Sequence, residues 1–457
     1  MRSVFLRGLA LIYLIAFASL LPQIHGLIGS HGILPAHDYL ESLRADYGQS
    51  VYTLYPTLAW LNSSDAFLSG MVLAGIVLSL LLFLRAVPLP ATIGLWILYL
   101  SIDTVGQVFY SFQWDALLLE VGFAAILISP WGWRPSYSTP VSRVGQLVFT
   151  FLIFRLMLES GLVKLLSGDP TWRNLTALKY HYETQPLPTP MAWYANLLPL
   201  FIQKVSVVGV FTVELIAPFF FWVKYRWAKT IAVLMSIALQ ILIAVTGNYT
   251  FFNLLTILLC LFVLAGKSAE RTPVIVSIVG IALITLGGLQ LLTMTGILPR
   301  LPEPIGWVNF QAETFHVMSG YGLFAVMTTT RPEIVIEGSD DGQQWKPYEF
   351  RYKPGDVNRR LSWVAPYQPR LDWQMWFAAL SNYRDNPWFS QLIVRLLEGE
   401  PAVTALLAKN PFPDKPPRLI RAVTYDYHFT DWSTRRRTGA IWTRGYIGEY
   451  FPQVSLR

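Results

Sequence analysis

Nine apolar stretches fill roughly the first two thirds of the chain, and polar segments rich in Pro, Gly and charged residues separate them. A helix needs about 20 apolar residues to cross a bilayer. The stretches that we predict to span are 4–21, 67–84, 91–112, 117–128, 144–166, 205–223, 231–245, 251–265 and 274–294. After Pro299, charges, Pro and Trp become frequent and no long apolar run remains. The pattern predicts a polytopic all-α membrane domain of about nine helices over residues 1–296 and a second domain over residues 297–457.

Two details of this pattern affect the count. The fourth and eighth stretches are short, so each is either tilted, re-entrant or fused with a neighbour. The first stretch follows Arg2 and Arg7, as in a signal peptide, but no small-x-small cleavage site comes after Leu21. We therefore expect an uncleaved anchor.

The second domain alternates between strand and helix patterns. Residues 333–338 alternate in polarity, Ser339-Asp-Asp-Gly is typical of a turn, and residues 344–352 return, which predicts a hairpin. Residues 373–380 and 388–407 have helical patterns, and residues 419–429 form a further strand pattern. We expect a mixed, β-rich domain with helices.

The basic residues of the short loops predict the orientation. Those before the first span and after the second, fourth, sixth and eighth spans fall on one side if there are nine crossings; they are Arg2, Arg7, Arg85, Arg134, Arg143, Lys224, Arg226, Lys229, Lys267 and Arg271. Basic short loops favour the cytoplasm. The C-terminal domain is therefore predicted to lie outside the cytosol, in a periplasm or an endoplasmic reticulum lumen.

Composition supports a bilayer environment and excludes several chemistries. The chain is 53% hydrophobic and only 14% charged, whereas soluble proteins average about 25% charged. Its net charge of +7 is largely due to loop residues that meet anionic headgroups, so no nucleic-acid partner is predicted. Cys260, inside an apolar stretch, is the only cysteine, which leaves the exported domain without a disulfide or thiol chemistry. The six His show no metal-ligand spacing, and no metal or cofactor is predicted.

Ionisable and amide side chains inside or beside the spans are the candidates for function, because such groups are costly in hydrocarbon and usually face a protein interior. This intramembrane polar cluster consists of Asp103, Gln107, Asp115, Glu120, Arg155, Glu159 and Glu214. Asp103 and Gln107 are four residues apart, as are Arg155 and Glu159, so each pair is expected to share a helix face. For Arg155 we favour an ion pair with Glu159, Glu120 or Glu214 that fixes helix packing.

Lys164 has two interpretations. It follows Glu159 by five residues and therefore points away from it, beside the small residues Ser160 and Gly161. It either snorkels to the outer interface, since Asp169 follows closely, or it is a desolvated amine that acts as a base at the mouth of a cavity.

Three long motifs resemble the lipase maturation factor family. They are Gln-Trp-Asp-Ala-Leu-Leu-Leu-Glu-Val-Gly at residues 113–122, Glu-Ser-Gly-Leu-Val-Lys-Leu-Leu-Ser-Gly-Asp-Pro-Thr-Trp-Arg-Asn-Leu-Thr-Ala-Leu at 159–178 and Tyr-His-Tyr-Glu-Thr-Gln-Pro-Leu-Pro-Thr-Pro at 180–190. Residues 366–380 and Asn386-Pro-Trp-Phe resemble the exported domain of that family. The resemblance spans nearly the whole chain.

The resemblance implies a polytopic, non-enzymatic maturation factor whose exported domain helps secreted lipases, or related exported proteins, to fold and assemble. Its partners would be the lipid bilayer and such a client. The absence of cysteine from the exported domain and a chain that begins directly with its first span favour a bacterial inner membrane; in a eukaryote the location would be the endoplasmic reticulum membrane. Residues with a predicted client contact are Arg370, Asp372, Trp373 and Trp376, although any one Trp of this domain is more readily explained by a core.

A second and more distant resemblance offers an alternative. Ser160-Gly-Leu-Val-Lys-Leu followed by Trp172 is similar to the vitamin K-dependent carboxylase-like membrane fold, in which the Lys is the catalytic base. Lys164 falls on that position. The alternative function is therefore a membrane enzyme that uses Lys164 as a base on a quinone or lipid-linked substrate, although a shared fold does not establish shared chemistry.

Overall fold

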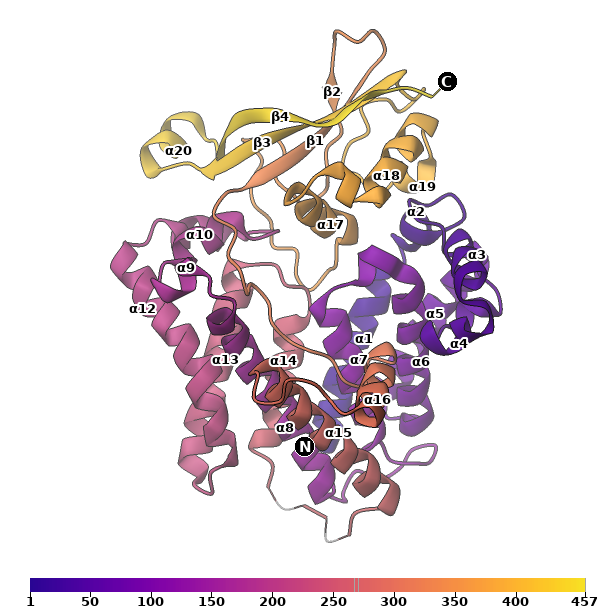
Figure 1. Ribbon diagram of the computed structural model, residues 1–457, viewed down its shortest axis with the longest axis vertical. Helices are drawn as coiled ribbons and strands as arrows, with labels where there is room; N and C mark the ends of the chain where they lie inside the picture. Colours follow the sequence, from indigo (N-terminus) through magenta and orange to yellow (C-terminus); the bar gives the residue numbers. More distant parts are fainter. Residues whose placement is uncertain (267, 270, 457) are drawn as a thin grey trace.

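A computed structural model describes residues 1–266, 268–269 and 271–456. Long helices form one body, and a sheet with short helices lies across one end of it (Figure 1). The N-terminal helices are α1 Arg2–Leu20, α2 Ile24–Ile28, α3 Ala36–Tyr47, α4 Val51–Leu54, α5 Asp65–Phe83, α6 Pro88–Gly106, α7 Gln113–Ile126 and α8 Arg143–Leu166. They are followed by α9 Pro170–Arg173, α10 Ala177–Thr184, α11 Pro190–Asn196, α12 Leu200–Phe211, α13 Arg226–Thr246, α14 Phe252–Val263, α15 Val274–Met294 and α16 Glu303–Thr314.

All nine apolar stretches lie in helices, which confirms the predicted fold class. Within the described residues, 7 helical segments are long and apolar enough to cross a membrane. The two short stretches form α7, with 14 residues, and α14, with 12. Local chemistry sets several of the helix starts, since the Ser64 hydroxyl accepts from the Phe67 amide at the start of α5 and Ser142 does the same for Gly145 at the start of α8.

Two spans are interrupted in ways that the hydropathy pattern does not reveal. α6 ends at Gly106 because Gln107 has a φ of 51°, after which residues 107–110 continue as a 3₁₀-helix. α12 passes into a π-helical turn at 212–216 and then a 3₁₀ segment that contains Pro218. Proline lacks the amide hydrogen of a regular helix, which explains the change at the second site. The prediction that Asp103 and Gln107 share a helix face is therefore wrong, because the first break lies between them.

The C-terminal elements are β1 Pro332–Ser339, β2 Lys346–Pro347, α17 Arg370–Ala379, α18 Pro387–Glu398, α19 Pro401–Thr404, β3 Leu419–Phe429, α20 Trp432–Thr438 and β4 Trp442–Val454. The antiparallel sheet has the order β2-β1-β3-β4. The predicted hairpin is present, with a second strand of only two residues. The single helix predicted over residues 388–407 is broken, because Gly399 ends α18 in the left-handed conformation and Pro401 starts α19.

The C-terminal domain packs directly on the membrane helices and is not joined to them by a free linker alone. α17 and α18 lie between the sheet and the long helices (Figure 1). Residues 316–327, which we call the strap, have no regular secondary structure and run along α8 before β1 begins. The division of the chain at residue 296 therefore stays a prediction, since part of the segment after it packs among the membrane helices.

The described basic loops lie at the end of the molecule opposite the sheet; Lys267, which the orientation prediction also used, lies outside the described residues. Arg2 donates to the carbonyl of Ser136, and the guanidinium groups of Arg2 and Arg85 both lie about 5.5 Å from the ring of Tyr137. A β-bridge joins Ser142 to Ala269. Figure 1 shows the N-terminus and these loops away from the sheet.

Candidate functional site

The centre of α8 contributes to a buried ion cluster that is hydrogen-bonded to the strap. Arg155 Nη2 lies 2.7 Å from Glu120 Oε1, and Arg155 Nε lies 3.3 Å from Glu159 Oε1. The two carboxylates also accept from the strap: the amide of Ser319 donates to Glu120, and the amide of Tyr321 donates to Glu159. All three charged side chains are at most 7% exposed. Glu120 and Glu159 are therefore the partners of Arg155, and Glu214 is not.

Further contacts complete the path of the strap toward the sheet. The hydroxyl of Tyr321 donates to Glu120 at 2.6 Å, and the amide of Met327 donates to Asp169 at 2.9 Å. Gly322 lies so close to α8 that an added Cβ would stand 2.8 Å from the Val163 side chain. Irregular backbone is tolerated at membrane depth only where protein satisfies its polar groups. The carboxylates thus provide the hydrogen-bond acceptors that allow the strap to run there.

Lys164 forms a second buried ion pair, on the other face of α8. Its Nζ lies 2.8 Å from Glu214 Oε2 and 3.0 Å from Glu214 Oε1, and it also donates to the carbonyl of Ser160 at 2.8 Å. The two side chains are 7% and 8% exposed. The ammonium group has three donors, and these three acceptors occupy them. Lys164 therefore does not snorkel to the interface and is not a free amine.

This ion pair borders a cavity of about 100 Å³ with mostly apolar walls. Trp172, His181 and Tyr249 also line it. Burial, with a smaller contribution from the Lys164 charge, lowers the pKa of His181 to about 4, so the imidazole is neutral near pH 7. The Tyr249 hydroxyl donates to Gln185 at 2.9 Å. The polar groups that line the cavity are thus the Lys164–Glu214 ion pair, whose donors are occupied, and neutral hydrogen-bonding side chains.

The remaining members of the predicted polar cluster are dispersed. Asp103 pairs with His316 of the strap, at 3.2 Å between Oδ2 and Nε2. Gln107 donates to the carbonyl of Leu34 at 3.2 Å. Asp115 belongs to neither ion cluster of α8. Each of these three groups contacts another part of the protein, and together they form several separate contacts in place of one centre.

Asp115 instead joins the two parts of the chain. The guanidinium of Arg370 in α17 makes a bidentate ion pair with Asp115 in α7, with N–O distances of 2.8 and 2.9 Å, and both side chains are 0% exposed. Tyr99 donates to Asp115, and Arg370 also donates to the carbonyl of Phe109 at 2.7 Å. Burial acts to lower the pKa of Arg370, but the Asp115 charge outweighs burial and raises that pKa above its usual value. The Asp115–Arg370 pair therefore spans the junction between the membrane helices and the C-terminal domain.

The four residues predicted to contact a client are all buried. Arg370 is 1% exposed, Asp372 is 2%, Trp373 is 4% and Trp376 is 7%. Asp372 accepts from the amides of Tyr352 and Lys353, and Trp373 packs on Trp114 with ring centroids 4.6 Å apart. In this conformation they stabilise the junction and present no surface to a client, which corrects that prediction.

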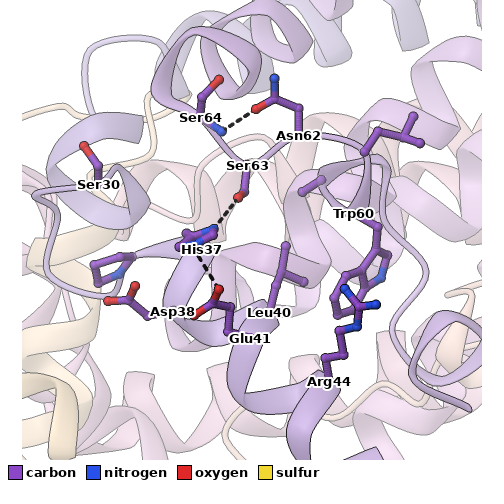
Figure 2. Close-up of a pocket in the computed structure, with 13 residues that line it drawn as sticks. Ser30, His37, Asp38, Leu40, Glu41, Arg44, Trp60, Asn62, Ser63 and Ser64 are labelled. Atoms are coloured by element: carbon purple, nitrogen blue, oxygen red, sulfur yellow. Dashed lines mark hydrogen bonds and ion pairs between the residues drawn. The ribbon is translucent and has the colours of Figure 1, made fainter. Parts of the chain in front are cut away.

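An open groove of about 580 Å³ lies beside α3, on a part of the chain where the sequence analysis predicted no site. Figure 2 shows His37 between Ser63 and Glu41, at 3.0 and 3.3 Å, with Arg44 and Trp60 farther along the groove. Leu61, which also lines it, is 78% exposed. Residues 36–47 form an amphipathic helix, and that polar face was the one available signal in the sequence.

Comparison with known proteins identifies the chain's relatives. The model of the lipase maturation factor transmembrane domain matches residues 1–271, and that of the lipase maturation factor C-terminal domain matches residues 317–452. The chain is 36% identical to lipase maturation factor 2 of Gallus gallus over an alignment of 583 positions, gaps included, which covers 100% of this chain and 81% of that protein. It is 34% identical to lipase maturation factor 1 of Homo sapiens over 499 positions, which cover 100% and 88%.

The two matched regions leave out residues 272–316, which contain α15 and α16. No solved structure matches this chain significantly. The similarity to the named relatives runs the full length of the chain and includes both domains. This membrane protein belongs to the lipase maturation factor family.

Proposed function

We propose that this protein assists the folding and assembly of secreted lipases or related exported proteins, with its C-terminal domain outside the cytosol. The observation that carries the proposal is the full-length similarity to proteins named lipase maturation factor. The buried junction supports a single rigid unit, in which the membrane helices hold the C-terminal domain in one orientation. No catalytic step is required of such a unit.

The distribution of charge supports the proposed orientation. Arg2 and Arg85 meet at Tyr137, at the end of the molecule opposite the sheet. Basic short loops stay on the cytoplasmic side, so the sheet would face a periplasm or lumen. The absence of cysteine from the C-terminal domain favours a bacterial inner membrane.

We further propose that a client contacts the groove beside α3, because the earlier candidates are buried. The groove combines exposed apolar surface at Leu61 with both signs of charge at Glu41 and Arg44. Clusters of exposed apolar residues rimmed by polar groups are typical of protein-binding surfaces. α3 lies close to α2, which packs against α19 of the C-terminal domain, so the groove would share its side of the membrane (Figure 1).

Deletion of the gene should lower the specific activity of secreted lipase several-fold, and the wild-type gene should restore it. A Leu61→Asp/Arg44→Glu variant should restore less, since a charge in an apolar contact and a reversed charge each cost roughly 1 kcal/mol or more of binding. Lipase activity per unit of secreted antigen is the measurement. Ile447→Asp, at a residue 58% exposed on β4, is the control. Fully active clients in the deletion strain would refute the function, and full rescue by the groove variant would refute only the site.

The geometry does not favour the alternative in which Lys164 is a catalytic base. A base needs a nitrogen that can reach the substrate, and Lys164 Nζ is instead occupied by the two carboxylate oxygens of Glu214 and the carbonyl of Ser160, at 2.8–3.0 Å. We therefore interpret Lys164 as a structural residue that forms an ion pair with Glu214 inside the helix bundle.

A pair of variants tests this interpretation. Lys164→Met should cost about 3–5 kcal/mol of unfolding free energy and lower the protein level, because it leaves Glu214 buried without a cation. Lys164→Met/Glu214→Gln should recover most of both stability and lipase maturation. Protein level and secreted lipase activity are measured together. A double variant that is present at the normal level but inactive would instead support a catalytic Lys164.

A further inference from the structure

α20 is fixed to the membrane domain by aromatic and cationic contacts. The rings of Trp432 in α20 and Trp193 in α11 lie 4.8 Å apart. The guanidinium of Arg435 lies 4.1 Å from the Trp193 ring and 5.6 Å from the Tyr194 ring. Cation–π contacts of this kind stabilise an orientation even at partly exposed sites. α20 is therefore held on α11 and does not move freely with the strands around it.

This attachment places α20 at the edge of the bilayer. Only residues 197–199 separate α11 from α12, the first part of a membrane-spanning segment. Large apolar side chains are exposed at this connection: Tyr194 is 42% exposed, Leu198 is 40% and Phe201 is 76%. Exposed aromatic residues at the end of a spanning helix are typical of the membrane–water interface. Figure 1 shows α20 projecting beyond the sheet on the side of α12.

The charge of α20 is uncompensated within the protein. Arg436 and Arg437 are exposed, and none of the three consecutive arginines forms an ion pair with a carboxylate of the described residues. The acidic residue next to them, Asp431, accepts from the Thr434 amide and the Ser433 hydroxyl as the N-cap of α20. A cationic helix is thus held against α11, close to the start of a membrane-spanning segment.

From these observations we propose that α20 binds the headgroups of anionic phospholipids in the leaflet on the side of the C-terminal domain. The phosphate and glycerol groups of a lipid such as phosphatidylglycerol match guanidinium donors, and Arg binds phosphate with two parallel hydrogen bonds. Trp432, which is 49% exposed, would enter the interface beside them. The contact would hold the C-terminal domain at a fixed tilt over the membrane.

Full-length protein in lipid nanodiscs provides the test. A fluorescent dye on Ser433→Cys, in a Cys260→Ser background, reports the distance of α20 from headgroups that carry a nitroxide quencher. Quenching should be stronger in discs with about 30 mol% phosphatidylglycerol than in phosphatidylcholine alone, and about 0.5 M salt should weaken it. Each basic residue at an anionic surface contributes roughly a fivefold gain, so Arg436→Gln/Arg437→Gln should reduce the contact equilibrium roughly 25-fold.

The matched control removes two exposed charges elsewhere in the same domain. Lys415→Gln/Arg418→Gln precedes β3 and should leave the quenching unchanged. The proposal would be overturned if phosphatidylglycerol did not increase the quenching, or if the control variant reduced it as much as Arg436→Gln/Arg437→Gln does. If soluble polyglutamate changes the dye fluorescence while anionic lipid leaves the quenching unchanged, the proposal is also overturned. An acidic protein surface would then be the partner of α20. Because the four substituted basic residues are exposed, both charge variants should keep the unfolding midpoint of their Ser433→Cys/Cys260→Ser parent.

Discussion

Replacement of Arg155 by Met should destabilise the protein by about 3–5 kcal/mol and release the strap, because it leaves two carboxylates buried without a cation. Glu120 and Glu159 would then lose their ion pair while still facing the amides of Ser319 and Tyr321. Unfolding in mixed detergent micelles measures the loss. Hydrogen exchange of the two strap amides should rise together with it, which separates this effect from a general loss of helix packing.

Two further variants make the Arg155 result interpretable. Arg143→Gln changes an exposed arginine at the start of the same helix and should alter stability by less than about 0.5 kcal/mol. Glu120→Gln/Arg155→Met/Glu159→Gln removes the whole charge set and should recover at least about half of the loss, since a neutral set has no buried charge to solvate. If Arg155→Met alone stays within about 1 kcal/mol of the wild type, the cluster does not stabilise the strap.

The spanning helices and one part of the polar cluster could be predicted from the sequence because both depend on neighbours along the chain. Hydropathy over a window detects α1 or α15 without any knowledge of packing. The i,i+4 spacing similarly places Glu159 beside Arg155. Glu120, which is 35 residues away, could be named only as one of several carboxylates able to pair with the same guanidinium.

The path of the strap could not be predicted, because its stabilisation comes from distant acceptors. Residues 316–327 are mostly apolar but too few to predict a spanning helix. The carboxylates of Glu120 and Glu159, more than 150 residues earlier, supply hydrogen-bond acceptors that make irregular backbone tolerable at membrane depth. The pairing of Lys164 with Glu214 depends on the π-helical turn of residues 212–216, which hydropathy does not detect. β4 was missed for a local reason, since Gly445, Gly448 and Pro452 interrupt its strand pattern.

The motif around Trp373 shows why a recognisable sequence can be assigned the wrong role. Charged and aromatic residues in a predicted exported domain suggest a binding surface. The same residue types also suit a buried junction, provided that each charge finds a partner. Arg370 pairs with Asp115, which is 255 residues away in the sequence, and Trp373 packs on Trp114, the residue before Asp115. Only the fold decides between the two roles.

Replacement of Arg370 by Met should be comparably severe, at about 3–5 kcal/mol, and should loosen the C-terminal domain from the membrane helices. Asp115 and the carbonyl of Phe109 would be left buried without their donor. A double-mutant cycle with Asp115→Asn should give a coupling energy of about 2–3 kcal/mol, because the two groups act as one unit. Arg384→Gln, an exposed arginine of the same domain, is the control.

The functional readout of the Arg370 variant distinguishes two ways in which the junction could matter. If the membrane helices orient the C-terminal domain for its client, Arg370→Met should reduce lipase maturation by more than the fall in protein level accounts for. Limited proteolysis between residues 340 and 370 should then report the loosened domain, since local opening exposes chain that is protected in the native state. If the stability losses of the Arg370→Met and Asp115→Asn variants simply add, or if the proteolysis pattern equals that of the wild type, the two parts of the chain fold independently of the Asp115–Arg370 pair. The function would then not require the rigid junction.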